Sequence, residues 1–437
     1  MVISELNAKL RTQNLNKQII LSFILKILSM ALGFLVIPKT LSILGDNQYG
    51  IWLTILSVVT WLVTFDVGIG NGLRNKLTEA LSVDDIITSQ KLISTAYIAL
   101  GCIGLFIIVL TVCIYPFLNW NVVFNTKLIT NSELGLTMFV ITIAIIVNFV
   151  ISIINQVMNA FQLAAYTNIL SVLQSFLFLS FLYILNYNHD LFTVTKVYSS
   201  CLIFSGLFVS FFFFNNKREY IPRLKFFEIK KVKEILKLGG GFFIIQIATV
   251  FMFSITSMLI IQLLKPADVT TYNVAFRLFS ILTLVFSLIV TPYWSAFTEA
   301  NRKGDFTWIK NAIFKLHIVL GIFILGALLL ILFHQSILDL WLGKNKVVPG
   351  WSVAITMGIY AIILNWSNIY SHYLNGIGKL RLQTIIAVVQ AIAIIPLCLL
   401  FTNYFSFGLF GIMLSMALCM LPFAIVGPII TYKTLKN

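Results

Sequence analysis

Two permanently charged side chains lie inside apolar stretches of the sequence. Lys26 and Arg277 each stand within a run of apolar residues that is long enough to form a membrane helix. A cation at the centre of such a helix costs about 2.5 to 3.5 kcal/mol on insertion scales, so each one needs a compensating environment. Polar or small residues share a helical face with each cation: Gln18, Ser22, Ser29 and Gly33 with Lys26, and Asn273, Ser280, Ser287 and Thr291 with Arg277. We predict that both cations face a water-filled cavity and can bind an anion there, with snorkelling toward an interface as the alternative.

Uncharged amides gather on one face of two other apolar runs. They recur every three or four residues, which is the spacing of one helical face. The first group is Asn148, Ser152, Asn155 and Asn159, and the second is Asn365, Asn368, His372 and Asn375. Amides and hydroxyls both donate and accept hydrogen bonds, which suits a hydroxyl-rich ligand such as a sugar. Hydrogen bonding between packed membrane helices, worth about 0.6 to 2 kcal/mol per contact, is an equally good interpretation.

Asp66 is the acidic residue that falls within a predicted membrane helix near its inner end. It stands two residues away from the polar stripe of that helix, so we expect it to pair with a cation such as Arg74 or Lys76. A proton or sodium site is the alternative. His372 has no second ligand at a spacing that suits a metal, and we predict no metal site.

The sequence carries no recognisable catalytic chemistry. It lacks the phosphate-binding loop of an ATPase, and the glycine-rich run from Gly68 to Gly72 lacks the strand and third glycine of a dinucleotide site. That run is more typical of a helix end. No nucleophile with a base and no pair of carboxylates stands in a loop long enough to form a site. We therefore predict a protein that is not an enzyme and needs no cofactor.

Twelve apolar stretches must position these residues. The chain of 437 residues is 59% hydrophobic and only 10% charged, with a mean hydropathy of +0.98. A soluble domain has roughly 25% charged residues, and a bilayer-spanning helix needs roughly 20 apolar residues. The predicted spans are 18–38, 51–69, 92–115, 135–155, 168–187, 196–214, 239–264, 272–295, 312–333, 351–371, 384–402 and 409–431. The predicted fold class is an all-α integral membrane protein with twelve transmembrane helices.

The basic residues report the orientation of these helices. With the N-terminus inside, 21 of the 30 Lys and Arg residues fall on inner segments and six on outer loops. This distribution follows the positive-inside rule and predicts that both termini are cytoplasmic. The net charge of +15 therefore reflects topology and contact with anionic lipids, and we predict no nucleic-acid binding.

The chain divides into two predicted halves of six helices. Residues 215–237 form the longest and most basic inner segment, and we interpret them as a cytoplasmic linker between lobes at 1–214 and 238–437. Landmarks recur across it: Asn159 and Gln174 match Asn375 and Gln390 at one common shift. An even number of helices per half predicts a parallel repeat, in which both lobes enter the membrane from the same side.

Three segments resemble a known family. They are GDNQYGIW at 45–52, FDVGIGNGLR at 65–74 and NGIGK at 375–379. These segments, with the length and the number of spans, resemble the bacterial polysaccharide and O-antigen flippases of the multidrug/oligosaccharidyl-lipid/polysaccharide exporter superfamily.

The resemblance implies a V-shaped pair of six-helix lobes in the bacterial inner membrane. It implies a multi-pass flippase that translocates an undecaprenyl-diphosphate-linked oligosaccharide, the repeat unit of O-antigen, capsule or exopolysaccharide, by alternating access. The family's cationic cavity falls on Lys26 and Arg277 by position. The implied partners are this substrate, membrane lipids and the proteins of lipopolysaccharide or other polysaccharide assembly.

The alternative function is a cation-coupled multidrug exporter on the same architecture, with Asp66 as the coupling carboxylate. The positive charges on the predicted cavity faces suit anions better than cationic drugs. A membrane-bound glycan polymerase is disfavoured, because the outer connections near 116–134 and 334–350 are short and carry no catalytic set.

Overall fold

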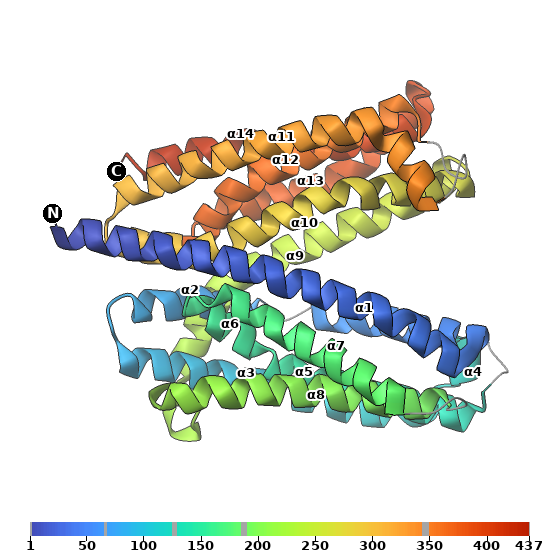
Figure 1. Ribbon diagram of the computed structural model, residues 1–437, viewed down its shortest axis with the longest axis horizontal. Helices are drawn as coiled ribbons and strands as arrows, with labels where there is room; N and C mark the ends of the chain where they lie inside the picture. The colour runs from blue at the N-terminus through green and yellow to red at the C-terminus, as the bar shows by residue number, and fades with distance from the viewer. Residues whose placement is uncertain (1, 65–67, 125–128, 185–189, 343–348, 437) are drawn as a thin grey trace. The chain divides into compact units, whose positions relative to one another are not determined.

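The computed structural model describes residues 2–64, 68–124, 129–184, 190–342 and 349–436 (Figure 1). Their backbone is helical almost throughout, and no strand occurs in these ranges. The helices are α1 (Val2–Thr64), α2 (Ile69–Leu81), α3 (Ile86–Ile114), α4 (Trp120–Val123), α5 (Asn131–Ile151), α6 (Ile153–Ala160), α7 (Thr167–Ile184), α8 (Leu191–Asn216), α9 (Ile229–Leu263), α10 (Pro266–Arg302), α11 (Phe306–Leu342), α12 (Trp351–Gly376), α13 (Arg381–Leu399) and α14 (Gly408–Thr434). The predicted all-α class is confirmed.

Within the described ranges, eleven helical stretches are long and apolar enough to cross a membrane. They correspond to every predicted span except 51–69. At that position α1 continues to Thr64 beyond a kink at Gly45, where φ is 67° and ψ is 168°. Residues 65–67 lie outside the described part of the chain, and Asp66 is one of them.

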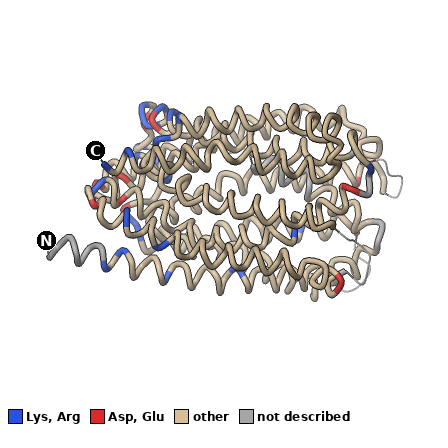
Figure 2. Tube along the Cα trace, turned by 90° about the horizontal axis from the view of Figure 1, so that it is seen from above, with Lys and Arg blue, Asp and Glu red and all other residues tan. Residues whose placement is uncertain are grey.

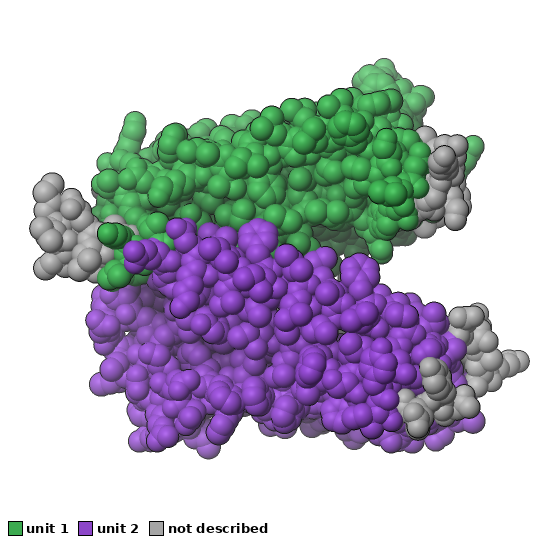
Figure 3. Space-filling model, viewed as in Figure 1, with its two compact units in different colours: residues 1–12, 241–437 green, residues 13–240 purple. Residues whose placement is uncertain are grey.

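The chain forms two compact units (Figure 3). Unit 2 holds residues 13–240, and unit 1 holds residues 1–12 together with 241–437. Two helices therefore contribute to both units, because α1 changes unit after Thr12 and α9 changes unit after Gly240. The lobe boundaries expected from the sequence, and the cytoplasmic position of both termini, stay predictions.

Figure 2 shows that Lys, Arg, Asp and Glu lie mainly at the ends of helices and leave most helix centres uncharged. Side-chain caps begin several of these helices. Asp85, Thr130 and Asp190 precede α3, α5 and α8, and each accepts a backbone N–H from three residues later, at 2.9, 3.3 and 3.0 Å. Such caps satisfy donors that the first helical turn leaves unpaired.

In unit 2, α8 packs against α5 and α7, and α3 packs against α2 and α5. Residues 215–237, which were expected to be a linker, form hydrogen bonds and an ion pair with this bundle. Ser94 on α3 accepts the N–H of Arg223 at 3.1 Å, and Thr95 accepts the N–H of Glu228, also at 3.1 Å. Lys91 forms an ion pair with Glu228 at 3.2 Å. Residues 215–237 thus belong to the packed structure of unit 2, and α9 already begins within them.

The glycine-rich run marks a helix crossing. Gly68 precedes α2 with φ at 74°, a left-handed conformation that favours glycine, so the expected helix boundary is present. The run also lies against α9. A Cβ at Gly68 would stand 1.9 Å from the carbonyl oxygen of Gly239, and one at Gly72 would stand 2.4 Å from that of Ile235. Small residues let the two backbones meet, as is common in membrane helix packing.

Helix α2, which takes part in this crossing, was not expected from the sequence. Arg74 and Asn75 on α2 are buried, at 3% and 0% exposure, where the charge pattern indicated an inner segment facing water. Thr78 donates to the carbonyl of Ala160 on α6 at 3.4 Å, which adds to the α2–α6 contact. Lys76, expected as a partner of Asp66, pairs with Glu79 at 2.8 Å.

In unit 1, α12 is the central helix and packs against α10, α11 and α14, while α13 packs against α14. The core between them is apolar and aromatic, with Phe279, Met357 and Met416 among its most buried members. The α10–α12 contact is close, since a Cβ at Gly376 would stand 2.8 Å from the carbonyl oxygen of Trp294. Thr298 donates to the carbonyl of Gly376 at 2.8 Å across the same contact.

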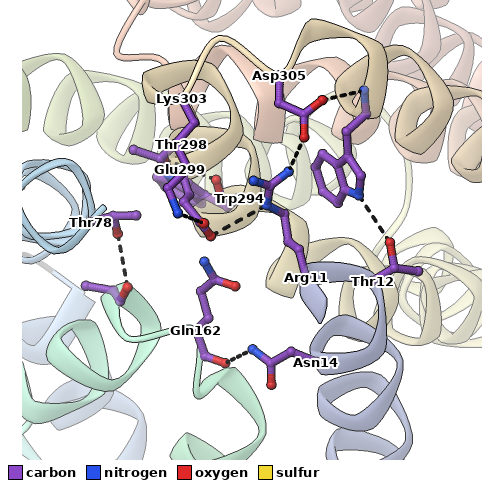
Figure 4. Close-up of polar contacts among 12 residues, drawn as sticks. Arg11, Thr12, Asn14, Thr78, Gln162, Trp294, Thr298, Glu299, Lys303 and Asp305 are labelled. Carbon is purple, nitrogen blue, oxygen red and sulfur yellow. Dashed lines mark hydrogen bonds and ion pairs between the residues drawn. The ribbon is translucent and has the colours of Figure 1, made fainter. Parts of the chain in front are cut away.

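The first turns of α1 join unit 1 through Arg11 (Figure 4). Its side chain is only 2% exposed, and Nη1 donates to Asp305 Oδ2 at 2.9 Å. Glu299 lies 3.6 Å from Nε, and the guanidinium stands 4.7 Å from the centre of the Trp308 ring. Trp308 in turn donates from Nε1 to Thr12 at 3.1 Å. A buried guanidinium needs such partners, because the desolvation of an unpaired charge is costly.

We expect Gly72→Ala to destabilise unit 2. The added methyl group would collide with a backbone oxygen of α9, and overpacking of this kind costs about 1 to 3 kcal/mol. Gly101→Ala on α3 is the matched control, since its Cβ has nothing within 4 Å and alanine favours a helix by roughly 0.5 to 1 kcal/mol. Thermal unfolding of the purified proteins in detergent measures both. Equal unfolding temperatures for the two variants would contradict the close α2–α9 crossing.

We expect Arg11→Met to destabilise unit 1 by about 1.5 to 3 kcal/mol, because a hydrogen bond to a charged group is worth that much and Asp305 loses its cationic partner, whereas Glu299 keeps Lys303 at 2.7 Å. Lys76→Met is the control. Its ion pair with Glu79 is about one-third exposed on both sides, and such pairs contribute roughly 0 to 1 kcal/mol. Thermal unfolding again gives the comparison, and a loss no larger than that of Lys76→Met would show that Arg11 does not stabilise this contact.

Candidate functional site

Unit 1 contains a cavity of about 230 Å³ that is lined by α9, α12, α13 and α14. Its α12 wall is built by residues three or four apart, which places them on one helical face. The polar members of this wall are Tyr360, Ser367, Asn368 and Ser371. Two amides, Gln383 and Gln390, come from α13, and Thr249 comes from α9. The cavity thus lies inside one bundle of membrane helices.

Four buried polar atoms of this lining have no hydrogen-bond partner among the described residues: Tyr360 OH, Ser367 Oγ, Gln383 Oε1 and Gln390 Nε2. Their residues are each at most 9% exposed. Buried polar groups in proteins are nearly always paired with protein atoms, water or a ligand. These four residues border the cavity, which favours water or a polar ligand as its content.

One hydrogen bond joins the α13 wall of the cavity to the α12 wall. Gln383 donates from Nε2 to Ser371 Oγ at 2.7 Å, so its Oε1 stays available as an acceptor. Phe253 and Phe423 supply apolar surface beside these polar groups. An aromatic wall with a few hydrogen-bonding groups is typical of sites for small polar molecules.

The cavity lining is electrically neutral, with no Asp, Glu, Lys or Arg among its residues. Burial of a charge without a partner is costly, so this lining favours a neutral ligand over an ion. Its hydroxyls and amides offer both donors and acceptors to a hydroxyl-rich group. The described residues also hold no cluster of His, Cys, Asp and Glu that could bind a metal ion.

The residues of the second predicted amide stripe lie in several different environments. Asn368 lines the cavity. Asn365 is 1% exposed within the α12 packing, and its Oδ1 has no partner among the described residues. His372 shares a hydrogen bond between Nδ1 and the Asn368 carbonyl at 2.8 Å and meets the Trp294 ring edge-on. Asn375 lies within 3.5 Å of Ser371 Oγ.

The first predicted stripe is interrupted at Ser152. This residue ends α5 and precedes α6, and its hydroxyl donates to the carbonyl of Phe149 at 2.9 Å. Asn148 is buried in α5, and Asn155 and Asn159 are half-buried in α6. The four residues therefore lie on two consecutive helices, α5 and α6, of one membrane span. Their proposed contact with sugars stays a prediction.

Lys26 is half-buried on α1 in unit 2. Two of its predicted polar neighbours are used for packing there, since Gln18 and Ser22 are buried and Gln18 Oε1 accepts the N–H of Ala165 at 2.9 Å. Lys26 itself has no ion-pair partner among the described residues. Its ammonium group can therefore accept an anionic ligand without first breaking an ion pair with those residues.

Arg277 is exposed on α10 in unit 1, and within the described ranges it too has no ion pair. Its neighbours bond to their own helix. Asn273 donates to the carbonyl of Val269 at 2.8 Å, and Ser280 and Ser287 donate to carbonyls three residues back at 2.9 and 2.7 Å. The predicted roles of Lys26 and Arg277 in anion binding stay predictions, and the role of Asp66 falls on a residue outside the described ranges.

Most residues of the cavity lining could not be identified from the sequence. Gln390 is a landmark of the predicted repeat, and a glutamine inside the apolar span 384–402 is also a signal of a polar site. Ser367, Ser371 and Gln383 gave no distinct signal, because their meaning depends on which helices face them. Arg11 likewise could not be paired with Asp305, which is 294 residues away in the sequence.

Comparisons with known proteins identify the family and the fold of this chain. The family described as "Polysaccharide biosynthesis protein" matches residues 15–298, more than half of the chain. A protein of Yersinia pseudotuberculosis named as an O-antigen export protein is 23% identical over 84% of both chains. One of Salmonella typhi named as an O-antigen transporter is 22% identical over 88% of this chain and 89% of its own.

A solved structure shares the fold. The Vibrio cholerae MATE transporter in its bent form has a TM-score of 0.78 at 12% identity, over 98% of both chains. At this identity the likeness shows the fold alone, and that fold is a twelve-helix transporter fold. The eleven candidate spans and the family match confirm a multi-pass bacterial membrane protein and the resemblance stated above. The chain belongs to the polysaccharide biosynthesis protein family.

Proposed function

We propose that this protein is a flippase-type transporter that moves an undecaprenyl-diphosphate-linked oligosaccharide across the bacterial inner membrane. The observation that carries the proposal is the neutral polar cavity inside the membrane helices of a chain from this family. Two relatives carry names that refer to O-antigen export or transport, and O-antigen is a polysaccharide, which supports a glycan as the cargo. It acts without catalysis and without a cofactor.

Lys26 and Arg277 bind the diphosphate in this proposal. A diphosphate needs cationic partners, and charge-assisted hydrogen bonds are roughly twice as strong as neutral ones. Both side chains are at least partly accessible and lack ion pairs among the described residues, which supports a role for them in binding an external anion. The prenyl tail can stay in the bilayer while the polar head crosses.

The neutral groups meet the sugars. Asn368, Gln383 and Gln390 offer amides in the unit 1 cavity, and the amides of α5 and α6 are the proposed counterpart in unit 2. Alternating access to the two sides of the membrane, driven by relative movement of two lobes, completes the proposed mechanism. Proteins of polysaccharide assembly are the proposed partners that supply and remove the cargo.

The second candidate function is a cation-coupled multidrug exporter. The fold it shares with MATE transporters favours it, but at 12% identity that likeness concerns the fold only. Such an exporter needs a carboxylate for the coupling ion, and the lining of the unit 1 cavity contains none. Its proposed carboxylate, Asp66, lies outside the described residues. The family match and the names of the relatives favour the glycan flippase over this exporter.

We expect Lys26→Gln and Arg277→Gln each to slow flipping about tenfold to a hundredfold, because a hydrogen bond to a charged group contributes about 1.5 to 3 kcal/mol. The assay follows a fluorescent lipid-linked glycan in vesicles that contain the purified protein. Lys9→Gln on α1 and Arg302→Gln at the end of α10 are exposed controls that should retain full activity. If Lys26→Gln and Arg277→Gln flip the glycan as fast as their controls, the diphosphate is bound elsewhere.

We expect Gln390→Met to slow flipping about twofold to tenfold, since a neutral hydrogen bond contributes about 0.5 to 1.5 kcal/mol. Its thermal stability should stay equal or rise, because the substitution removes a buried amide nitrogen without a described partner. Gln335→Met on α11, outside the cavity lining, is the control. A loss of stability with unchanged flipping would mean that Gln390 serves the fold and does not contact the cargo.

A further inference from the structure

A groove in unit 2 has a lining that includes none of the residues proposed to bind cargo. It has a volume of about 390 Å³ and runs between α8 and the segment that joins α6 to α7. Its walls are almost entirely apolar and include Met158, Leu163, Ile169, Phe208 and Phe212. A hydrocarbon chain is the natural occupant of such a wall at the surface of a membrane helix.

One end of the groove is polar. Asn216, Lys217 and Tyr166 complete its lining, and Asn216 and Lys217 stand where α8 ends. Tyr166 directly precedes α7. Since α7 and α8 are consecutive membrane spans joined by a short connection, they run antiparallel, and the start of α7 lies beside the end of α8. The three polar groups therefore share one end of the groove.

Lys217 is exposed, so its ammonium group is available to a ligand. Its Nζ stands 5.8 Å from the centre of the Phe161 ring, which keeps the side chain near the groove. The carboxyl end of α8 carries a partial negative charge of about half a unit, which disfavours an anion. The full charge of Lys217, with that of Arg218 next to it, exceeds this opposing charge.

The chain beyond the groove is strongly basic. Residues 217–237 contain eight Lys and Arg residues against three Glu residues. Basic segments next to a membrane helix attract anionic lipids, whereas uncharged and zwitterionic headgroups gain nothing from them. Lys217 lines the groove and Arg218 follows it directly, so the first charges of this segment favour an anionic headgroup there.

A row of phenylalanines on α8 runs along the groove. Phe204, Phe208 and Phe212 are four residues apart on α8 and exposed, and neighbouring ring centres lie 5.9 and 4.6 Å apart. Exposed Phe on a membrane helix alone indicates ordinary contact with lipid. A groove with phenyl rings along one wall and a cation at one end suits both the acyl chain and the headgroup of one lipid molecule.

We propose that this groove is a binding site for an anionic phospholipid. The phosphate of the headgroup lies at Lys217, within reach of the Asn216 amide and the Tyr166 hydroxyl. One acyl chain follows the apolar wall past Phe208 and Phe212. The site differs from the proposed cargo site in its position on α8 and in its ligand, a phosphoglyceride that stays bound to the protein.

The test uses the purified full-length protein in detergent, titrated with phosphatidylglycerol or with phosphatidylcholine of the same chains. Native mass spectrometry measures the bound lipid. We expect phosphatidylglycerol to bind at least about fivefold more tightly, and Lys217→Gln to remove about fivefold of that preference, the effect of one basic residue near an anionic surface. Lys225→Gln, an exposed basic residue of the same segment outside the groove, is the matched control and should bind like the unsubstituted protein.

Ile169→Trp tests the apolar wall separately. The larger side chain fills the groove, so we expect weaker binding of both lipids at an unchanged unfolding temperature. Equal affinity for the two lipids, or equal effects of Lys217→Gln and Lys225→Gln, would overturn the headgroup assignment. Unchanged binding in Ile169→Trp would overturn the groove. Displacement of phosphatidylglycerol by a tenfold lower concentration of undecaprenyl phosphate would show that the site takes an isoprenoid lipid, and the proposal would then be wrong.

Discussion

The hydrocarbon core of a bilayer offers no hydrogen-bond partner, and this constraint governs the whole chain. The backbone satisfies it by forming helices. Most hydroxyls within the spans satisfy it by donating to a carbonyl one turn back, as Thr256 and Thr356 do at 2.7 Å. A buried polar atom without such a partner is unusual and, beside a cavity, favours water or a ligand there. The cavity of unit 1 gathers four of these atoms from two helices, which is why its lining is the best-supported candidate for a site.

The membrane helices could be predicted because the length of an apolar run is a local property of the sequence. Their ends could not. The span expected at 239–264 belongs to a helix that starts at Ile229, and the span expected at 272–295 belongs to one that ends at Arg302. Hydropathy registers the part of a helix that hydrocarbon can surround, whereas the helical hydrogen bonds continue into polar turns beyond it. The buried helix α2 escaped prediction for the same reason, because its charge pattern resembles that of a solvated segment.

The candidate site was predictable on one helix and unpredictable across helices. The spacing within α12 identified a polar face, and Asn368 on it lines the cavity. The opposite wall comes from Gln383 and Gln390 on α13. The spacing of residues within one helix cannot predict which other helix faces it. The same limit applies to Arg11, whose partners Glu299 and Asp305 belong to the other end of the sequence. Long-range packing decides which polar residues stabilise the fold and which remain available to a ligand.

A lipid-linked glycan has a charged part and a neutral part, and the chain offers both kinds of group on different helices. Lys26 and Arg277 are cationic, whereas the cavity between α12 and α13 carries no charged residue in its lining. The neutral lining matters for release as much as for binding. Neutral hydrogen bonds contribute only about 0.5 to 1.5 kcal/mol each after the loss of water, so a few of them orient a sugar without holding it firmly. A transport site needs this weakness, because a ligand that binds too tightly on one side of the membrane does not leave on the other.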